Sequence, residues 1–175
     1  MLRAELEHLI RAASAITDQY EIMIVGSQSI LGAVPEPPAA LAESMEADVY
    51  PLHRPDLADL IDGAIGEGSP FHDRFGYYAQ GVGPETAVLP KGWETRLVRI
   101  QNPNTDLKVG FCLDPHDLAV SKLAAGRAKD WPFVDAMIKN HIVQVPLLQS
   151  RVTELPIANL GKIKAWLAAR QAASD

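Results

Sequence analysis

The sequence predicts an α/β (α+β) protein in which a small mixed β-sheet is flanked by helices and followed by a helical C-terminal part. Short apolar runs with strand character alternate with helical patterns through residues 1–113, whereas residues 114–175 show helical patterns alone. The composition, 47% hydrophobic and 22% charged, is ordinary for a globular protein. We therefore expect an α/β core over residues 1–113 and a helical part over residues 114–175 that packs on the same domain.

The N-terminal segment predicts a helix, a buried strand and a turn, in that order. Apolar side chains recur with helical spacing through residues 2–18, as Leu2, Leu6, Leu9, Ile10, Ala13 and Ile16. Residues 21–25 (Glu-Ile-Met-Ile-Val) form a short β-branched run that is typical of a buried strand. Gly26 and Ser27 follow it directly, and residues 28–31 can begin a helix. The Gly-Ser pair is therefore expected at a strand-to-helix turn.

The middle of the chain is predicted to alternate between strands and helices. Three prolines within residues 35–38 indicate a loop, because proline cannot donate to a sheet ladder. Ser69 followed by Pro70 is a favourable helix start. The expected elements are one helical turn at 39–44, a strand at 46–50, a helix at 55–65, a strand at 75–82, and a hairpin of strands 95–100 and 107–113 across a turn at 102–104.

The last third of the chain is predicted to be helical. Asp114 followed by Pro115 is a strong helix start, because aspartate caps a helix and proline suits its first position. Further helices are expected at 133–140 after Asp130, at 146–154 and at 157–173. Gly161 is expected to weaken the last of these.

Charge and cysteine content limit the class of protein. The formal net charge of -6 argues against general nucleic-acid binding, which needs clustered lysine and arginine. The single cysteine, Cys112, allows no internal disulfide and is expected to be a buried apolar residue. No apolar run is long enough to span a bilayer, and the N-terminal helix lacks the pattern of a signal peptide. We therefore expect a cytoplasmic protein that does not bind membranes.

Two features of the first two strands suggest chemistry on a nucleotide. Small residues at Gly26 and Ser27 allow backbone N–H groups to approach a phosphate, and a helix that starts there adds a favourable dipole. Glu46 and Asp48 lie two positions apart on a strand, so their carboxylates point to the same face. Two such carboxylates can hold Mg²⁺, which prefers oxygen ligands and keeps waters for substrate phosphates. Each feature taken alone is common in ordinary turns and solvated strands.

These residues resemble a known family. Residues 24–27 (Ile-Val-Gly-Ser) and 44–49 (Ser-Met-Glu-Ala-Asp-Val) are similar to the nucleotidyltransferase superfamily of the polymerase-beta type, in which a Gly-Ser or Gly-Gly turn precedes an acid-x-Asp strand. Residues 113–130 resemble a lysine-, arginine- and aspartate-bearing helix of nucleotidyltransferase-like proteins from abortive-infection and toxin–antitoxin systems. The resemblance covers roughly residues 20–140 and implies a nucleotidyltransferase-like fold.

The resemblance also implies a site and a reaction. It implies that Glu46 and Asp48 bind Mg²⁺ and act in catalysis together with Lys122 and Asp130. Gly26, Ser27 and Arg127 would bind the nucleotide. The implied reaction moves a nucleotidyl group from a nucleoside triphosphate to a hydroxyl of RNA or protein, with an antitoxin as partner if the chain belongs to a toxin–antitoxin system.

The chain departs from the family pattern at one important position. Catalytically complete members usually carry a third carboxylate on a later strand, but here residues 77–82 contain Gln80 and no acid. Asp73, Glu85 and Glu94 are candidates to replace it, although none lies clearly within a strand. Three hypotheses therefore stay open: an active nucleotidyltransferase, a catalytically degenerate binding or partner protein of the same fold, and an unrelated α/β domain.

Two further groups have competing interpretations. The charged residues around Lys122 and Asp130 can also form a solvated helix face with local ion pairs, each worth about 0.3–0.5 kcal/mol. Lys91 and Trp93 can reach a base or phosphate, but a tight turn with a packed tryptophan is the simpler interpretation.

Overall fold

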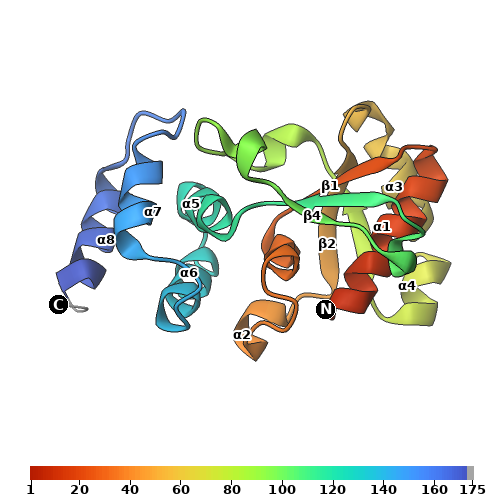
Figure 1. Ribbon diagram of the computed structural model, residues 1–175, viewed down its shortest axis with the longest axis horizontal. Helices are drawn as coiled ribbons and strands as arrows, with labels where there is room; N and C mark the ends of the chain where they lie inside the picture. Colours follow the sequence, from red (N-terminus) through yellow and green to blue (C-terminus); the bar gives the residue numbers. More distant parts are fainter. Residues whose placement is uncertain (173–175) are drawn as a thin grey trace.

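The computed structural model describes residues 1–172, and it confirms the predicted α/β class with a five-stranded mixed sheet and flanking helices (Figure 1). Its strands are β1 (Glu21–Val25), β2 (Glu46–Pro51), β3 (Tyr78–Gly81), β4 (Val98–Ile100) and β5 (Val109–Cys112). Its α-helices are α1 (Arg3–Thr17), α2 (Ala39–Ala42), α3 (Ala58–Ile65), α4 (Pro70–Phe75), α5 (Pro115–Ala125), α6 (Asp130–Lys139), α7 (Val145–Val152) and α8 (Gly161–Ala172). Short 3₁₀ helices include η1 (Ser27–Gly32) and η4 (Trp93–Arg96).

Strand β1 lies at the centre of the sheet, whose order is β3-β2-β1-β5-β4. It pairs antiparallel with β2 and parallel with β5, and its residues 22–25 are all buried, as the apolar run predicted. The predicted hairpin is confirmed, since β4 and β5 are antiparallel neighbours. Strand β3 is added parallel to β2 at the other edge. This order brings the end of β1 next to the middle of β2, where Val25 lies opposite Asp48.

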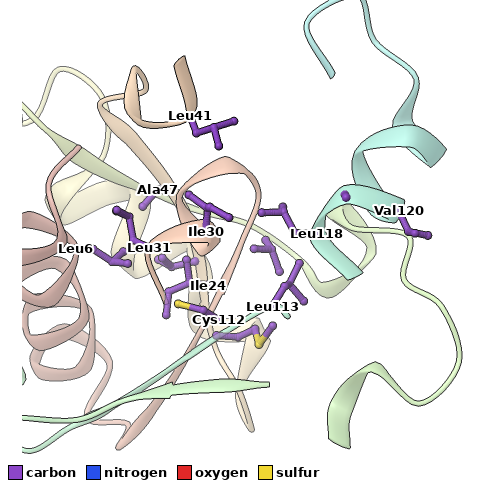
Figure 2. Close-up of a cluster of buried hydrophobic side chains, with 14 of the residues drawn as sticks. Leu6, Ile24, Ile30, Leu31, Leu41, Ala47, Cys112, Leu113, Leu118 and Val120 are labelled. Atoms are coloured by element: carbon purple, nitrogen blue, oxygen red, sulfur yellow. The ribbon is translucent and has the colours of Figure 1, made fainter. Parts of the chain in front are cut away.

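The two faces of the sheet differ in chemistry. Directly paired residues point to the same side of a sheet, so Ile24, Val49 and their neighbours Ala47 and Ala79 share one face. Helix α1 contacts β1, β2, β3 and β5 and also packs against α3, so these two helices cover that face. Figure 2 shows Ile24, Ala47 and Cys112 gathered there with Leu6 of α1. The alternate residues, Glu46 and Asp48 among them, therefore belong to the opposite face.

The C-terminal helices extend the molecule away from α1, α3 and α4 (Figure 1). Helix α5 packs against η1, α6 and α7, and α7 packs against α8. The predicted cap is confirmed, because the Asp114 side chain accepts hydrogen bonds from the backbone N–H groups of His116 and Asp117. The C-terminal helices thus contact the rest of the fold where α5 packs against η1 and α6 against α2. The division of the chain at residue 113 stays a prediction.

Three expected elements have different limits in the structure. The strand expected at 75–82 is shorter, because α4 continues to Phe75 and ends at Gly76 in the left-handed conformation (φ 77°). The strand expected at 95–100 begins as the 3₁₀ helix η4. The last helix starts at Gly161 instead of residue 157, so the glycine lies at a helix end and does not weaken the interior. Residue 173 of that expected helix lies outside the described residues.

Two other expectations concern burial and membranes. Cys112 is fully buried, as predicted, and this burial raises the pKa of its thiol to about 12. Among the helices of residues 1–172, none has the length and apolar character needed to cross a bilayer.

Candidate active site

The turn after β1 requires glycine. Gly26 has a φ of +67°, and a Cβ added there would lie 2.2 Å from Oδ2 of Asp48. The backbone therefore touches the carboxylate of the neighbouring strand, and any side chain at this position would displace it. Ser27 follows as the first residue of η1, at the strand-to-helix turn that the sequence predicted.

The predicted acid pair lies on one face of β2. Asp48 is paired with Gln80 of β3, and Glu46 is paired with Tyr78, whose Oη donates a 3.0 Å hydrogen bond to Oε2 of Glu46. Burial, followed by the neighbouring Glu46 carboxylate, raises the pKa of Asp48 to about 6. Within residues 1–172 neither carboxylate forms a direct ion pair, although the more distant charges of Lys122 and Arg127 act to lower the pKa of Asp48.

Lys122 connects the C-terminal half to the Gly-Ser turn. It comes from α5, is only 6% exposed, and its Nζ donates a 2.7 Å hydrogen bond to Oγ of Ser27. The same Nζ lies 3.5 Å from Oδ1 of Asp130. Burial is the largest influence on this ammonium group and holds its pKa below the ordinary value. A lysine buried at this cost is placed for contact with a ligand or with the turn itself.

Asp130 organises the two cations beside it. It is 1% exposed and accepts hydrogen bonds from Nε and from the backbone N–H of Arg127, at 2.8 and 3.1 Å. Burial acts to raise the pKa of Asp130, but the hydrogen bonds from Arg127 and the charge of Lys122 outweigh it, and the pKa is lowered. The Arg127 side chain remains 57% exposed, so its guanidinium is also accessible from solvent.

Two cavities meet at Lys122. One has a volume of about 170 Å³, and Gly26, Asp48, Lys122 and Arg127 are among its lining residues. The other, about 520 Å³, lies between η1, α2, α5 and α6, and it is lined by Ser27, Lys122 and Asp130 together with residues of α2 and α6. Lys122 lines both cavities, so it lies on the same side of the sheet as Asp48.

The structure therefore brings the predicted site residues together. Gly26, Ser27, Asp48, Lys122, Arg127 and Asp130 all line one or both of the two cavities. Glu46 lies two residues before Asp48 on the same face of β2. The roles predicted for these residues in catalysis and binding stay predictions.

No third carboxylate from residues 1–172 joins the acid pair in a group that could hold one metal ion. Within residues 1–172 there is no group of three or more histidine, cysteine, aspartate or glutamate side chains placed to hold one metal ion. Gln80, beside Asp48, takes the position where the family pattern suggests an acid. Asp73 is exposed on α4, and Glu85 is exposed in a short 3₁₀ helix. Glu94 lines a separate cavity of about 450 Å³ with Trp93 and Phe111.

The separate cavity also decides between the two interpretations of Trp93. Trp93 is partly buried against the hydrophobic core and lines this cavity with Leu97 and Phe111, but it lines neither cavity at Lys122. The packing interpretation of Trp93 is therefore favoured.

Sequence reasoning missed much of the larger cavity. Gln28, Leu41 and Phe133 line it, and none of them was a candidate from the sequence. Gln28 had one local indication, because it is a long polar residue directly after the Gly-Ser turn and begins a segment that is buried through Leu31. Phe133 had no such indication, since an aromatic residue in a helix usually belongs to the core.

Comparisons with known proteins identify one family. A family model described as "Nucleotidyltransferase of unknown function (DUF6036)" matches residues 4–167. No curated protein and no solved structure matches the chain. The description agrees with the resemblance that residues 24–27, 44–49 and 113–130 indicated, so that prediction is confirmed.

Proposed function

The chain belongs to this family of nucleotidyltransferases, and we propose that it transfers a nucleotidyl group from a nucleoside triphosphate to a hydroxyl of RNA or protein with the help of Mg²⁺. The observation that carries the proposal is the position of Lys122, which bonds to Ser27 and lines one cavity with Asp48 and Gly26. Asp48, the glycine turn and two cations line one small space, with Glu46 beside Asp48 on the same strand face, and this arrangement suits a phosphate chain and its metal ion.

Glu46 and Asp48 fit a magnesium ion. Burial and then the neighbouring Glu46 carboxylate raise the pKa of Asp48, and a divalent cation would stabilise both carboxylates in their charged form. Mg²⁺ commonly binds through one or two carboxylates and completes its shell with waters and phosphate oxygens, so a set of two acids is sufficient. When bound, the ion would supply positive charge beside the reacting phosphate.

The other residues act on the phosphates. In the proposed reaction the acceptor hydroxyl oxygen forms a bond to the α-phosphorus, the bond to the β-phosphate oxygen breaks, pyrophosphate leaves, and the hydroxyl proton is released. Lys122 and Arg127 place positive charge where the leaving pyrophosphate gains negative charge. Asp130 acts as a positioning residue, because its hydrogen bonds hold Arg127 and its charge faces Lys122.

A second candidate function is a nucleotide-binding partner protein without catalysis. It is favoured by Gln80 beside Asp48, where a third acid would complete the carboxylate set. In both functions a small protein partner of the antitoxin type is part of the proposal, and it rests on the resemblance of residues 113–130 alone.

Label transfer distinguishes the two functions. Each of the four α-³²P-labelled nucleoside triphosphates is incubated with the protein, MgCl₂, and total RNA or cell extract. We expect label in RNA or protein, reduced by a factor on the order of 10²–10³ in Asp48→Asn because charge stabilisation at the reacting phosphate is lost. The matched control is Asp73→Asn, an exposed acid on α4 that should leave transfer unchanged.

Two outcomes would redirect the proposal. Thermal stabilisation by nucleotide and MgCl₂ without label transfer would favour the binding protein, since a ligand that binds the native state raises its melting temperature. Neither transfer nor stabilisation with any of the four nucleotides would contradict both functions.

A further inference from the structure

One residue in the wall of the larger cavity at Lys122 carries a buried polar group that has no partner in residues 1–172. Gln28 is 1% exposed, and neither Nε2 nor Oε1 of its side chain has a hydrogen-bond partner within residues 1–172. Leaving a buried amide unsatisfied costs roughly 1–3 kcal/mol per group, and native structures contain few such groups. A cost of this size, in a side chain that lines a cavity, calls for a partner that is supplied from outside the chain.

The segment that carries Gln28 is fixed on both sides. Ser27 accepts the hydrogen bond from Lys122, and Oγ of Ser29 accepts one from the backbone N–H of Leu113 at the end of β5. These bonds join η1 to α5 and to the sheet. Gln28 is therefore held in place, and its free amide does not result from a loose loop.

The cavity around Gln28 has the character of a site for a flat, partly apolar ligand. Leu41, Pro132 and Phe133 give it apolar walls, and Ser44 adds a hydroxyl. Nζ of Lys122 lies 5.2 Å from the centre of the Phe133 ring, so a positive charge and an aromatic face lie next to each other in the cavity wall. A volume of about 520 Å³ lies within the range of small-molecule sites, which is about 300–1,000 Å³.

The smaller cavity cannot hold a whole nucleotide. At about 170 Å³ it is below the range of about 300–1,000 Å³ for sites that enclose a small molecule. A ligand whose phosphates lie beside Asp48 and Arg127 must therefore extend into another space. Lys122 lines both cavities, so the larger one lies next to the phosphate side at this residue.

We propose that the larger cavity binds the nucleobase of the nucleoside triphosphate and that the carboxamide of Gln28 hydrogen-bonds the edge of the base. This inference rests on the proposed function. A carboxamide offers a donor and an acceptor side by side, and glutamine uses this pair to bind adenine through two hydrogen bonds. Phe133 supplies a face on which the base can stack, an interaction that is available to every base.

The test separates stability from binding in a single variant. Gln28→Met keeps the length of the side chain and removes both polar atoms, and Gln149→Met, on α7 and outside the cavity, is the matched control. Isothermal titration calorimetry measures the dissociation constants of ATP, GTP, CTP, UTP and inorganic tripolyphosphate, each with MgCl₂. Thermal unfolding without ligand measures the stability of each protein.

The proposal predicts opposite changes in the two measurements. The melting temperature of Gln28→Met should equal or exceed that of the wild type, because an unsatisfied amide has been removed. Its dissociation constant for the preferred nucleotide should rise about tenfold to a hundredfold, the effect of losing two hydrogen bonds to a base. Its affinity for tripolyphosphate should stay unchanged, because that probe has no base.

The outcomes distinguish this proposal from the proposed function. If the wild type binds tripolyphosphate and nucleotides but Gln28→Met binds them equally well, the base site is wrong while the phosphate site stands. A lower melting temperature with unchanged nucleotide affinity would also overturn it, and would show that Gln28 has a structural partner such as a buried water. If Gln28→Met weakens tripolyphosphate as much as the nucleotides, the residue does not contact the base. Failure of the wild type to bind any of the five probes would contradict the proposed function and this inference together.

Discussion

Two regions of the molecule each contain a pair of acidic side chains, but within residues 1–172 only one pair forms direct ion pairs with arginine. In the first region, Glu46 and Asp48 lie on one face of β2. In the second, Asp114 caps α5 and Asp117 lies in its first turn, where Arg96 binds Asp117 and Arg151 binds both. Both pairs are largely shielded from solvent, so burial alone does not distinguish them.

The arginine partners of the second pair change the direction in which the pKa of a buried carboxylate is shifted. Asp117 is fully buried, accepts two hydrogen bonds from Arg96 at 2.8 and 3.1 Å, and receives a third from Arg151 at 2.7 Å. Burial acts to raise the pKa of Asp114, but hydrogen bonds with His116 and the charge of Arg151 lower it to about 2. In the first region, burial and a like charge act together and raise the pKa of Asp48 to about 6. A satisfied pair of this kind fixes a helix, whereas an unsatisfied pair is left for a ligand.

The largest effect that would sharpen this comparison is expected at Asp117. In Asp117→Asn the two arginines lose a buried carboxylate, and removing one partner of a buried ion pair costs about 3–5 kcal/mol of unfolding free energy. Urea unfolding followed by circular dichroism measures this change, with Asp73→Asn as an exposed control. A loss below about 1 kcal/mol would show that the network at α5 does not hold the fold together.

Asp48→Asn is expected to change stability in the other direction. The pKa of Asp48 in the folded state is about 6, against an ordinary 3.8. The stability that Asp48 contributes is therefore present below pH 3.8 and lost as the pH rises through 6. At pH 7.5 without divalent ions, the variant should be more stable than the wild type by about 1–2 kcal/mol. This figure is smaller than the full free energy that a pKa shift of this size corresponds to. At pH 3.5 the two proteins should unfold at the same urea concentration. A less stable variant at pH 7.5 would contradict the description of an uncompensated pair.

The smallest effect is expected at Asp114, with the opposite dependence on pH. Asparagine preserves the helix cap, so Asp114→Asn removes the charge alone and should cost about 1 kcal/mol at pH 7. A lowered folded-state pKa stabilises the protein above the ordinary 3.8, and this stability is lost as the pH falls through about 2. Unfolding measured between pH 2 and pH 7 should therefore show the variant approach the wild type only in the acid range. A difference that disappears already at pH 5 would exclude this explanation.

The sequence predicted the parts of the site that depend on neighbouring residues. The bounds of β1 and the start of β2 follow from short apolar and alternating runs, and the Asp114 cap follows from a local pattern. The closeness of Gly26 and Asp48 was expected, because both motifs belong to one site in the nucleotidyltransferase superfamily that the sequence resembles. The parallel addition of β3 to β2 was not predictable, because these strands are joined by two helices and share no turn.

Long-range partners could not be predicted. Arg96 and Arg151 are 21 and 34 residues from Asp117, and no periodicity joins them. The free amide of Gln28 is equally inaccessible from sequence, because it depends on the absence of a partner from α2, α5 and α6 together. Local composition sets which residues can form a site, whereas tertiary packing decides which of their polar groups remain without a hydrogen-bond or ion-pair partner.

The anchoring of α5 has a consequence for the order in which the protein matures. Lys122 stands on the same helix as Asp117, and that helix is fastened to Arg151 of α7. During synthesis the sheet, the Gly26 turn and the acid pair emerge from the ribosome first, since translation proceeds from the N-terminus. Arg96 emerges before α5 and Arg151 after it. A nascent chain that stops before Arg151 therefore holds Asp117 through Arg96 alone, and the helix that carries Lys122 is fully anchored only after most of the protein has been made.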